Sequence, residues 1–267
     1  MMVTAAFAAL VTLAGGVAFP HPDASVASRP QAQPNPSPLS AWERQCLRSS
    51  DRARVVTFQT ADRKRLVGVE MGSGTVGVVL GHQVRSTICE WLPHARRLAR
   101  GGFRVLAFDF RSQGSSATRP VSGPELVRLS RADLDMAAAA RFIRGRGASK
   151  VVLVGSSMGG TGALVAATQV VPPVSAVVAL SPPRTYGRTD AVAAGARLTV
   201  PVLIIAAQDD AGFSGEAQAV FDGIASTDKQ LELVAGSKHG TYLLEGAQGA
   251  PLRALFDRYI RERTGRS

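Results

Sequence analysis

The chain has 267 residues, 45% of them hydrophobic, so it is long enough to bury the core of one α/β domain. Its formal net charge of +11 comes from 27 arginines and 4 lysines that are spread along the sequence. A nucleic-acid-binding protein would cluster its basic residues and interleave aromatic ones, yet aromatic residues make up only 6% of this chain. We therefore expect no nucleic-acid binding, and a basic surface suited to peripheral contact with an anionic cell envelope.

The first 19 residues are apolar and carry no charged side chain. A run slightly shorter than the ~20 residues of a membrane span is typical of a signal peptide, and Ser25-Val26-Ala27 supplies a small-x-small cleavage site. No lysine or arginine precedes the run, which leaves an uncleaved anchor as the alternative. We predict that residues 1–27 are a signal peptide or an N-terminal anchor, and that the protein is secreted or held in the cell envelope.

Proline marks the segment that follows. Six prolines lie between residues 20 and 40, together with serine, alanine and glutamine. Such a composition cannot bury a core and stays extended. Residues 28–41 are therefore predicted to be a linker, and residues 42–267 to form one folded domain.

Within that domain, β-rich apolar runs alternate with segments of helical spacing. The last six runs are separated mostly by helix-length segments, which indicates an α/β fold with a mostly parallel, twisted sheet of about eight strands flanked by helices. Among the helices, Pro251–Glu262 has one apolar face, and Ser130 with Asp133 resembles a capping box at the start of another. The predicted strands are Val55–Gln59, Leu66–Met71, Val76–Gly81, Val105–Phe108, Val151–Gly155, Val174–Leu180, Val202–Ala207 and Leu231–Val234.

The clearest catalytic signal is Gly155-Ser156-Ser157-Met158-Gly159, which continues a strand-like run. A G-x-S-x-G motif at a strand-to-helix turn holds its serine in a strained conformation, and the two glycines let the turn close. The next amide, here that of Met158, is then free at the helix N-terminus to bind a developing oxyanion. We predict Ser157 as the nucleophile, with the off-centre Ser156 as a competitor. A glycine-rich turn without chemistry, or a phosphate cradle, is the structural alternative.

A serine nucleophile needs a base, and histidine is the side chain that titrates nearest neutral pH. Of the four histidines only His239 follows Ser157 in the sequence, in a loop after the last predicted strand. The chain order serine, acid, histidine is typical of nucleophile-elbow enzymes, so His239 is predicted as the base. The acid is expected after the strand between them, where the usual spacing favours Asp210 and leaves Asp209 as the alternative.

With these motifs the chain from about Arg54 to Tyr259 resembles the α/β-hydrolase family, in its serine esterase and dienelactone-hydrolase-like branch. The resemblance rests on the serine elbow, the acid after its strand, the histidine loop and two further segments, VVLGHQ at 78–83 and GFRVLAFDFR at 102–111. It implies the α/β-hydrolase fold and no metal or organic cofactor. It also implies an oxyanion hole built from the backbone amides of Gln83 and Met158. Because Gly81-His82 stands where the family usually has His-Gly, His82 is the alternative donor.

The combined motifs predict a serine hydrolase that cleaves small-molecule carboxylic esters or thioesters through an acyl-enzyme on Ser157. An acyltransferase or peptidase with the same triad is one alternative. A catalytically inactive, hydrolase-like binding protein is the other. The sequence does not indicate an oligomeric state.

Two further expectations concern the surroundings of the site. Only about 20 residues join the strands that end at Leu180 and begin at Val202, so we expect a minimal cap and a shallow site bounded by 83–88, 182–186 and Phe213. Such a site favours short acyl groups. Cys46 and Cys89 are the only cysteines, and in an exported chain such a pair predicts a disulfide, with two buried thiols as the alternative.

Overall fold

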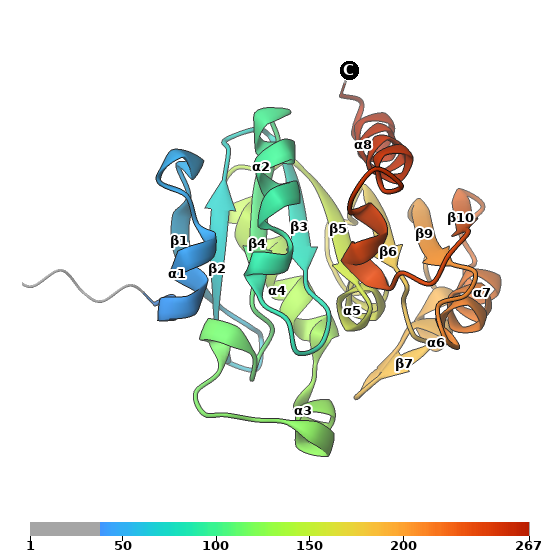
Figure 1. Cartoon of the computed structure of the whole chain (residues 1–267), viewed down its shortest axis with the longest axis horizontal. Helices are drawn as coiled ribbons and strands as arrows, with labels where there is room; N and C mark the ends of the chain where they lie inside the picture. Colours follow the sequence, from blue (N-terminus) through green and yellow to red (C-terminus); the bar gives the residue numbers. More distant parts are fainter. Residues whose placement is uncertain (1–37, 267) are drawn as a thin grey trace, which may run out of the picture. The chain divides into compact units, whose positions relative to one another are not determined.

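The computed structural model of the protein describes residues 38–266. The predicted signal peptide or anchor, and most of the predicted linker, lie outside these residues. The described residues form an eight-stranded sheet with the strand order β1-β2-β4-β3-β5-β6-β9-β10 (Figure 1). Strand β2 pairs antiparallel with β1 on one side and with β4 on the other, whereas the pairs from β4 to β10 are all parallel.

Each of the eight predicted strands is present, with ends shifted by at most two residues. Their apolar, β-branched sequences suit a sheet that is covered on both faces. The five strands in its middle, β4, β3, β5, β6 and β9, are buried along nearly their whole length. The strands are β1 (Arg54–Gln59), β2 (Arg65–Met71), β3 (Val76–Gly81), β4 (Arg104–Phe108), β5 (Lys150–Ser156), β6 (Ala176–Leu180), β9 (Val202–Ala207) and β10 (Lys229–Val234).

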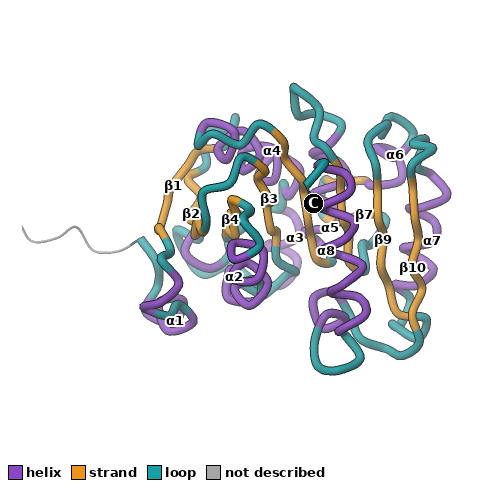
Figure 2. The backbone as a smooth tube through the Cα atoms, turned by 90° about the horizontal axis from the view of Figure 1, so that it is seen from above, coloured by secondary structure: helices purple, strands orange, loops and turns teal. Residues whose placement is uncertain are grey.

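Helices cover both faces of the sheet, because neighbouring strand residues point to opposite sides. Val78 and Leu80 pack on the face covered by α2 (Leu92–Arg100) and α8 (Ala250–Thr264). Val79, between them, packs on the other face, which is covered by the three helices α4 (Ala132–Gly145), α5 (Met158–Ala167) and α7 (Phe213–Gly223). Figure 2 shows this layered arrangement from above. Between residues 38 and 266 no helix is both long and apolar enough to cross a membrane.

Helix α8 agrees with its prediction, but the start of α4 does not. Helix α4 begins at Ala132 with Arg131 as its N-cap, and no side chain caps it. The predicted capping box of Ser130 and Asp133 is therefore wrong. Ser130 instead ends the preceding helix, α3 (Gly123–Leu129), and the Asp133 carboxylate accepts hydrogen bonds from the Arg131 guanidinium at 3.0 and 3.1 Å.

The connections at the carboxyl ends of the parallel strands are short. Residues 181–201, between β6 and β9, hold only the hairpin of β7 (Thr185–Tyr186) and β8 (Thr189–Asp190) and the one-turn helix α6 (Ala191–Gly195). This agrees with the expected minimal cap. A second excursion between β4 and α4, which contains α3, was not predicted. It lies close to the hairpin, because Gly187 approaches the backbone of Val127 (Figure 1).

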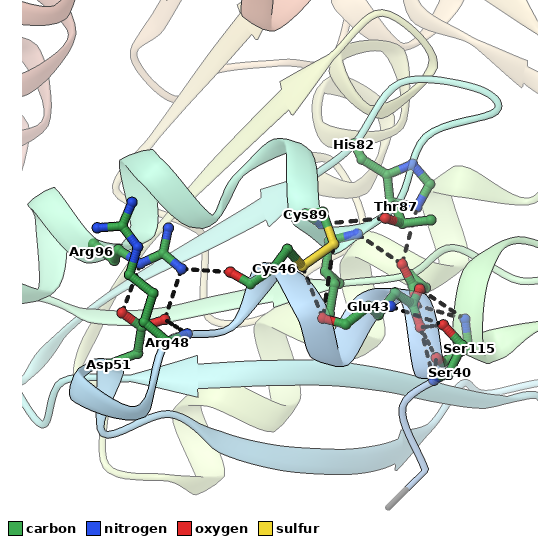
Figure 3. The surroundings of a disulfide bond; sticks show 12 residues. Ser40, Glu43, Cys46, Arg48, Asp51, His82, Thr87, Cys89, Arg96 and Ser115 are labelled. Atoms are coloured by element: carbon green, nitrogen blue, oxygen red, sulfur yellow. Dashed lines mark hydrogen bonds and ion pairs between the residues drawn. A yellow bond between two sulfur atoms is a disulfide. The ribbon is translucent and has the colours of Figure 1, made fainter.

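The domain begins with α1 (Ala41–Cys46), which a disulfide fastens to the sheet. Cys46 bonds to Cys89 in the 3₁₀ turn η2 (Ile88–Glu90), with a Cα–Cα distance of 5.7 Å (Figure 3). The predicted disulfide is therefore present. Arg96 of α2 reinforces the junction, because its guanidinium donates to the Cys46 carbonyl and pairs with Asp51 at 2.7 Å.

The buried carboxyl groups of Glu43 and Asp109 also help to join α1 to η2. Burial and the neighbouring Glu43, whose side chain hydrogen-bonds with that of Asp109, raise the pKa of Asp109 well above its usual range. The Asp109 carboxyl also accepts from the amides of Ile88 and Ser115, at 2.9 and 2.8 Å. Helix α1, η2 and the loop after β4 are thus joined in one network (Figure 3).

Replacing both cysteines, Cys46→Ser with Cys89→Ser, is expected to lower the free energy of unfolding. The bond spans 43 residues. Without it the unfolded chain gains conformational entropy, which lowers the free energy of unfolding by about 4 kcal/mol on the chain-entropy account. Guanidinium denaturation with and without a reducing agent measures the change. The reductant should destabilise the wild type by the same amount and leave the double variant unchanged. Equal stability of the oxidised wild type and the double variant would contradict a structural role for the bond.

Candidate active site

Ser157 occupies the turn between β5 and α5 in a strained backbone conformation. Its φ is 50° and its ψ is −118°, which a residue with a side chain adopts only where the surroundings enforce it. The two glycines of the motif explain the turn. A Cβ at Gly155 would overlap the carbonyl of Gly159, and a Cβ at Gly159 would overlap that of Gly81 in β3. The turn therefore has the geometry that the motif predicts.

The predicted acid and base lie against each other although 29 residues separate them in the chain. His239 Nδ1 is 2.7 Å from Asp210 Oδ2, and Asp210 is 5% exposed. Asp209 is exposed and uses its amide to bond the Gly236 carbonyl. With its proton on Nδ1, His239 donates a hydrogen bond to the Asp210 carboxylate. The other ring nitrogen is then free to accept a proton. The ring of Phe213 packs on the imidazole with centroids 4.3 Å apart.

Two serines at neighbouring strand ends fasten the histidine loop to the elbow. The amide of Gly240 donates to Ser181 Oγ, and the amide of Thr241 donates to Ser156 Oγ, each at 3.1 Å. Ser156 is fully buried and is occupied by this bond. Ser181 was not among the predicted site residues, although a polar residue directly after a buried parallel strand is a signal for such a position.

The Ser157 hydroxyl forms no hydrogen bond to any other residue between 38 and 266. Its contact with His239 therefore stays a prediction. The two are nonetheless brought to the same edge of the sheet, because the residue before Ser157 binds the second residue after His239.

The two predicted oxyanion donors, the amides of Met158 and Gln83, differ in whether they already have a hydrogen-bond acceptor. The amide of Met158 is the first of α5, where a helix offers no acceptor of its own. The amide of Gln83, in contrast, donates to the carboxyl of Glu90 at 3.3 and 3.4 Å. The Gln83 side chain also contacts the elbow, because its Oε1 accepts from Ser156 Oγ at 3.3 Å.

His82 has a structural part in this loop. Its ring is fully buried, and burial lowers its pKa to about 4. Nδ1 is 2.7 Å from the Gln83 carbonyl, and Nε2 accepts from the Phe110 amide at 3.2 Å. A neutral imidazole satisfies both contacts, so His82 holds the end of β3 against the loop after β4.

Glu90 was not singled out by the sequence analysis, yet it lies where three loops meet. Burial raises the pKa of its carboxyl to about 7, against the opposing effect of hydrogen bonds from Ser86, Gln83, Thr241 and Ser156. These partners belong to the loop after β3, the elbow and the histidine loop. The carboxyl has no cation among them, so its environment favours the protonated form.

No set of three or more histidine, cysteine, aspartate or glutamate side chains in the described part of the chain is arranged to hold a metal ion.

Comparison with known families identifies the protein's class. Residues 86–256 match the model of the alpha/beta hydrolase family, and this range is more than half of the chain. The protein therefore belongs to the α/β-hydrolase family, as its elbow, sheet order and strand-end acid and histidine also indicate. No curated protein matches the sequence.

Solved structures of similar architecture include three hydrolases. An esterase from Pyrococcus furiosus superposes with a TM-score of 0.65 at 16% identity, over 80% of this chain and 92% of its own. A dienelactone hydrolase from Anabaena variabilis gives 0.62 at 19% identity, over 79% and 97%. A monoacylglycerol lipase from Paleococcus ferrophilus gives 0.62 at 17% identity, over 74% and 99%. At these identities the likeness establishes the shared fold.

The variant Glu90→Gln is expected to change how stability depends on pH. The unfolded chain ionises Glu90 near its ordinary pKa of 4.5, whereas the folded protein keeps the proton up to about pH 7. The stabilisation from this group is therefore complete below pH 4.5 and is lost as pH rises through 7. Denaturation between pH 4.5 and 8 should show a decline in the wild type that is smaller in Glu90→Gln. Glu245→Gln, at an exposed site, is the matched control, and an equal decline in all three proteins would contradict the raised pKa.

Proposed function

We propose that the protein is a serine hydrolase that cleaves carboxylic esters or thioesters of small molecules, with Ser157 as nucleophile, His239 as base and Asp210 as acid. The observation that carries the proposal is the strained conformation of Ser157 at the edge where the hydrogen-bonded Asp210–His239 pair also lies. Strain of this kind is kept where the surrounding structure and the chemistry require it.

The reaction proceeds in two halves. Ser157 Oγ attacks the carbonyl carbon while its proton passes to the free ring nitrogen of His239. The tetrahedral intermediate collapses, the bond to the leaving alcohol or thiol breaks, and that group takes the proton from His239. A water molecule then attacks the acyl-enzyme and gives a proton to His239, which returns it to Ser157 as the acid leaves. Asp210 stabilises the imidazolium in both halves.

The negative charge on the tetrahedral oxygen is held by the Met158 amide together with that of Gln83. The Gln83 amide must turn from Glu90 to the oxyanion for this. A protonated Glu90 is a weaker acceptor than its carboxylate and gives up the amide more readily. Ionisation of Glu90 above pH 7 therefore opposes turnover, both by retaining the amide and by adding negative charge beside the oxyanion.

The same acyl-enzyme would serve an acyltransferase or a peptidase, which differ only in the acceptor or the leaving group. A binding protein without activity would not form the acyl-enzyme at all. Reaction with a fluorophosphonate probe, which needs an activated serine, separates this last class from the enzymes.

We also propose that the protein is exported by its N-terminal segment. The Cys46–Cys89 bond supports this, because disulfides persist in oxidising compartments and are rare in reducing ones.

Ser157→Ala is expected to lower kcat for an activated ester such as p-nitrophenyl butyrate by about 10⁴-fold or more, because the acyl-enzyme cannot form. It should also abolish fluorophosphonate labelling. Ser156→Ala is the matched control, since it removes a hydroxyl one residue away that contacts the Thr241 amide and the Gln83 side chain. It should retain labelling and lose about 100-fold or less in kcat, as for loss of two neutral hydrogen bonds of about 1 kcal/mol each. Labelling that survives in Ser157→Ala would place the nucleophile elsewhere.

Expression of the full chain in a bacterium with a working secretory pathway tests export. The mature protein is expected outside the cytoplasm with Ser28 at its N-terminus, as intact mass would report. Recovery of the uncut chain from the membrane fraction supports the anchor instead. Deletion of residues 2–19 is the control and should keep the protein in the cytoplasm. A full-length chain that stays there without the deletion contradicts the proposal.

A further inference from the structure

A cleft opens directly beside the predicted oxyanion loop. This inner cleft has a volume of about 370 Å³ and is lined by Arg85–Thr87, by 112–114 and by the segment that leads into α3. Gln113 connects it to the elbow, because its side chain accepts from the Arg85 amide at 2.8 Å and lies 3.6 Å from Met158 Sδ. The remaining wall is largely apolar and comes from Ala117, Pro120, Val121 and Leu126.

A second cleft continues from the first. It has a volume of about 430 Å³, and the two share Ser112, Arg119 and Val121 in their linings. We call it the basic cleft, because seven of its lining residues are lysine or arginine whereas only Asp62 is acidic. The shared residues make the two clefts one path that begins beside residues 85–87, in the loop after β3.

Four of the seven cations in the basic cleft are already paired with carboxylates. They are Arg111 with Asp62 and Asp135, Arg131 with Asp133, and Arg119 and Arg128 with Glu125. These pairs shape the wall and leave it little net charge.

The other three cations are Lys64, Arg65 and Arg188. All three are exposed, and none forms an ion pair with a carboxylate among residues 38–266. Lys64 and Arg65 stand at the start of β2, whereas Arg188 lies in the β7–β8 turn. Positive charge from two distant segments thus converges on one cavity, whose single lining carboxylate, Asp62, is paired with Arg111. Two arginines and a lysine together are suited to bind a carboxylate or a phosphate.

We propose that the inner cleft and the basic cleft form one substrate groove, and that the preferred substrate is an ester bearing an anionic group at the end of an apolar spacer. The reacting carbonyl lies at Ser157, the spacer lies along the apolar wall of the inner cleft, and the anion is bound by Lys64, Arg65 and Arg188. The proposal deepens the proposed function and rests on it.

Two pairs of p-nitrophenyl esters test the groove. In the first pair one acyl chain ends in a free carboxylate and its partner of equal length in the neutral methyl ester; in the second pair one ends in a phosphate monoester and its partner in the neutral dimethyl phosphate triester. We expect kcat/KM to favour the anionic member roughly tenfold, as three exposed ion pairs together would give, and mainly through KM. The two anionic arms show whether carboxylate or phosphate is preferred. Added salt should reduce the preference.

Paired triple variants separate the cleft from the overall positive field. Lys64→Gln/Arg65→Gln/Arg188→Gln should reduce the ratio of anionic to neutral kcat/KM about tenfold. Arg54→Gln/Arg100→Gln/Arg141→Gln removes the same charge from exposed arginines outside the two clefts and should leave the ratio unchanged.

Equal ratios in the wild type and the cleft variant would overturn the inference, as would an equal fall in both variants. A wild type that hydrolyses the neutral esters but does not prefer the anionic ones contradicts this inference alone. A wild type that hydrolyses none of the esters and does not react with a fluorophosphonate contradicts the proposed function itself.

Discussion

The close backbone approach at the elbow is the constraint on which the rest of this structure depends. Gly155 and Gly159 let the end of β5 turn into α5 within one residue, and the second of them also lets α5 lie against β3. Any side chain at either position would push the helix away from the sheet. Because β3 leads into the predicted oxyanion loop, one packing contact sets where Ser157 lies relative to Gln83. The relative positions of these two segments therefore depend on glycine at both positions.

Most of the sheet was predictable from the sequence, because a buried parallel strand needs an unbroken run of apolar, mostly β-branched residues, and each such run became a strand. The order of Ser157, Asp210 and His239 was predictable for a related reason, since strand ends of a parallel sheet meet at one edge. Ser181 follows the same rule, because it comes directly after β6, although its bond to the Gly240 amide joins segments far apart in the chain. Glu90 could not be found this way, because it follows no strand and belongs to no spacing pattern.

The capping box predicted for Ser130 and Asp133 was wrong because a local pattern was overridden by the neighbouring helix. A serine three residues before an aspartate is a local signal for a helix start, but Ser130 was already used to end α3, a short helix without strong periodicity. Helix α3 itself was not predicted, because it has only seven residues and follows a loop rich in serine, proline and glycine. So short a helix carries little helical periodicity. The excursion that forms the wall of the inner cleft therefore became visible only in the folded chain.

The disulfide has a consequence for when the site becomes complete. Cys89 immediately precedes Glu90, so the covalent bond to α1 anchors the same turn whose carboxyl holds the Gln83 amide. In a newly made chain in a reducing environment, hydrogen bonds and the packing of the buried Ile88 keep this turn in place without a covalent bond. Oxidation then adds a covalent restraint at Cys89, six residues after Gln83 in the chain. The redox state of the compartment in which the chain folds therefore also decides how firmly the predicted oxyanion loop is held.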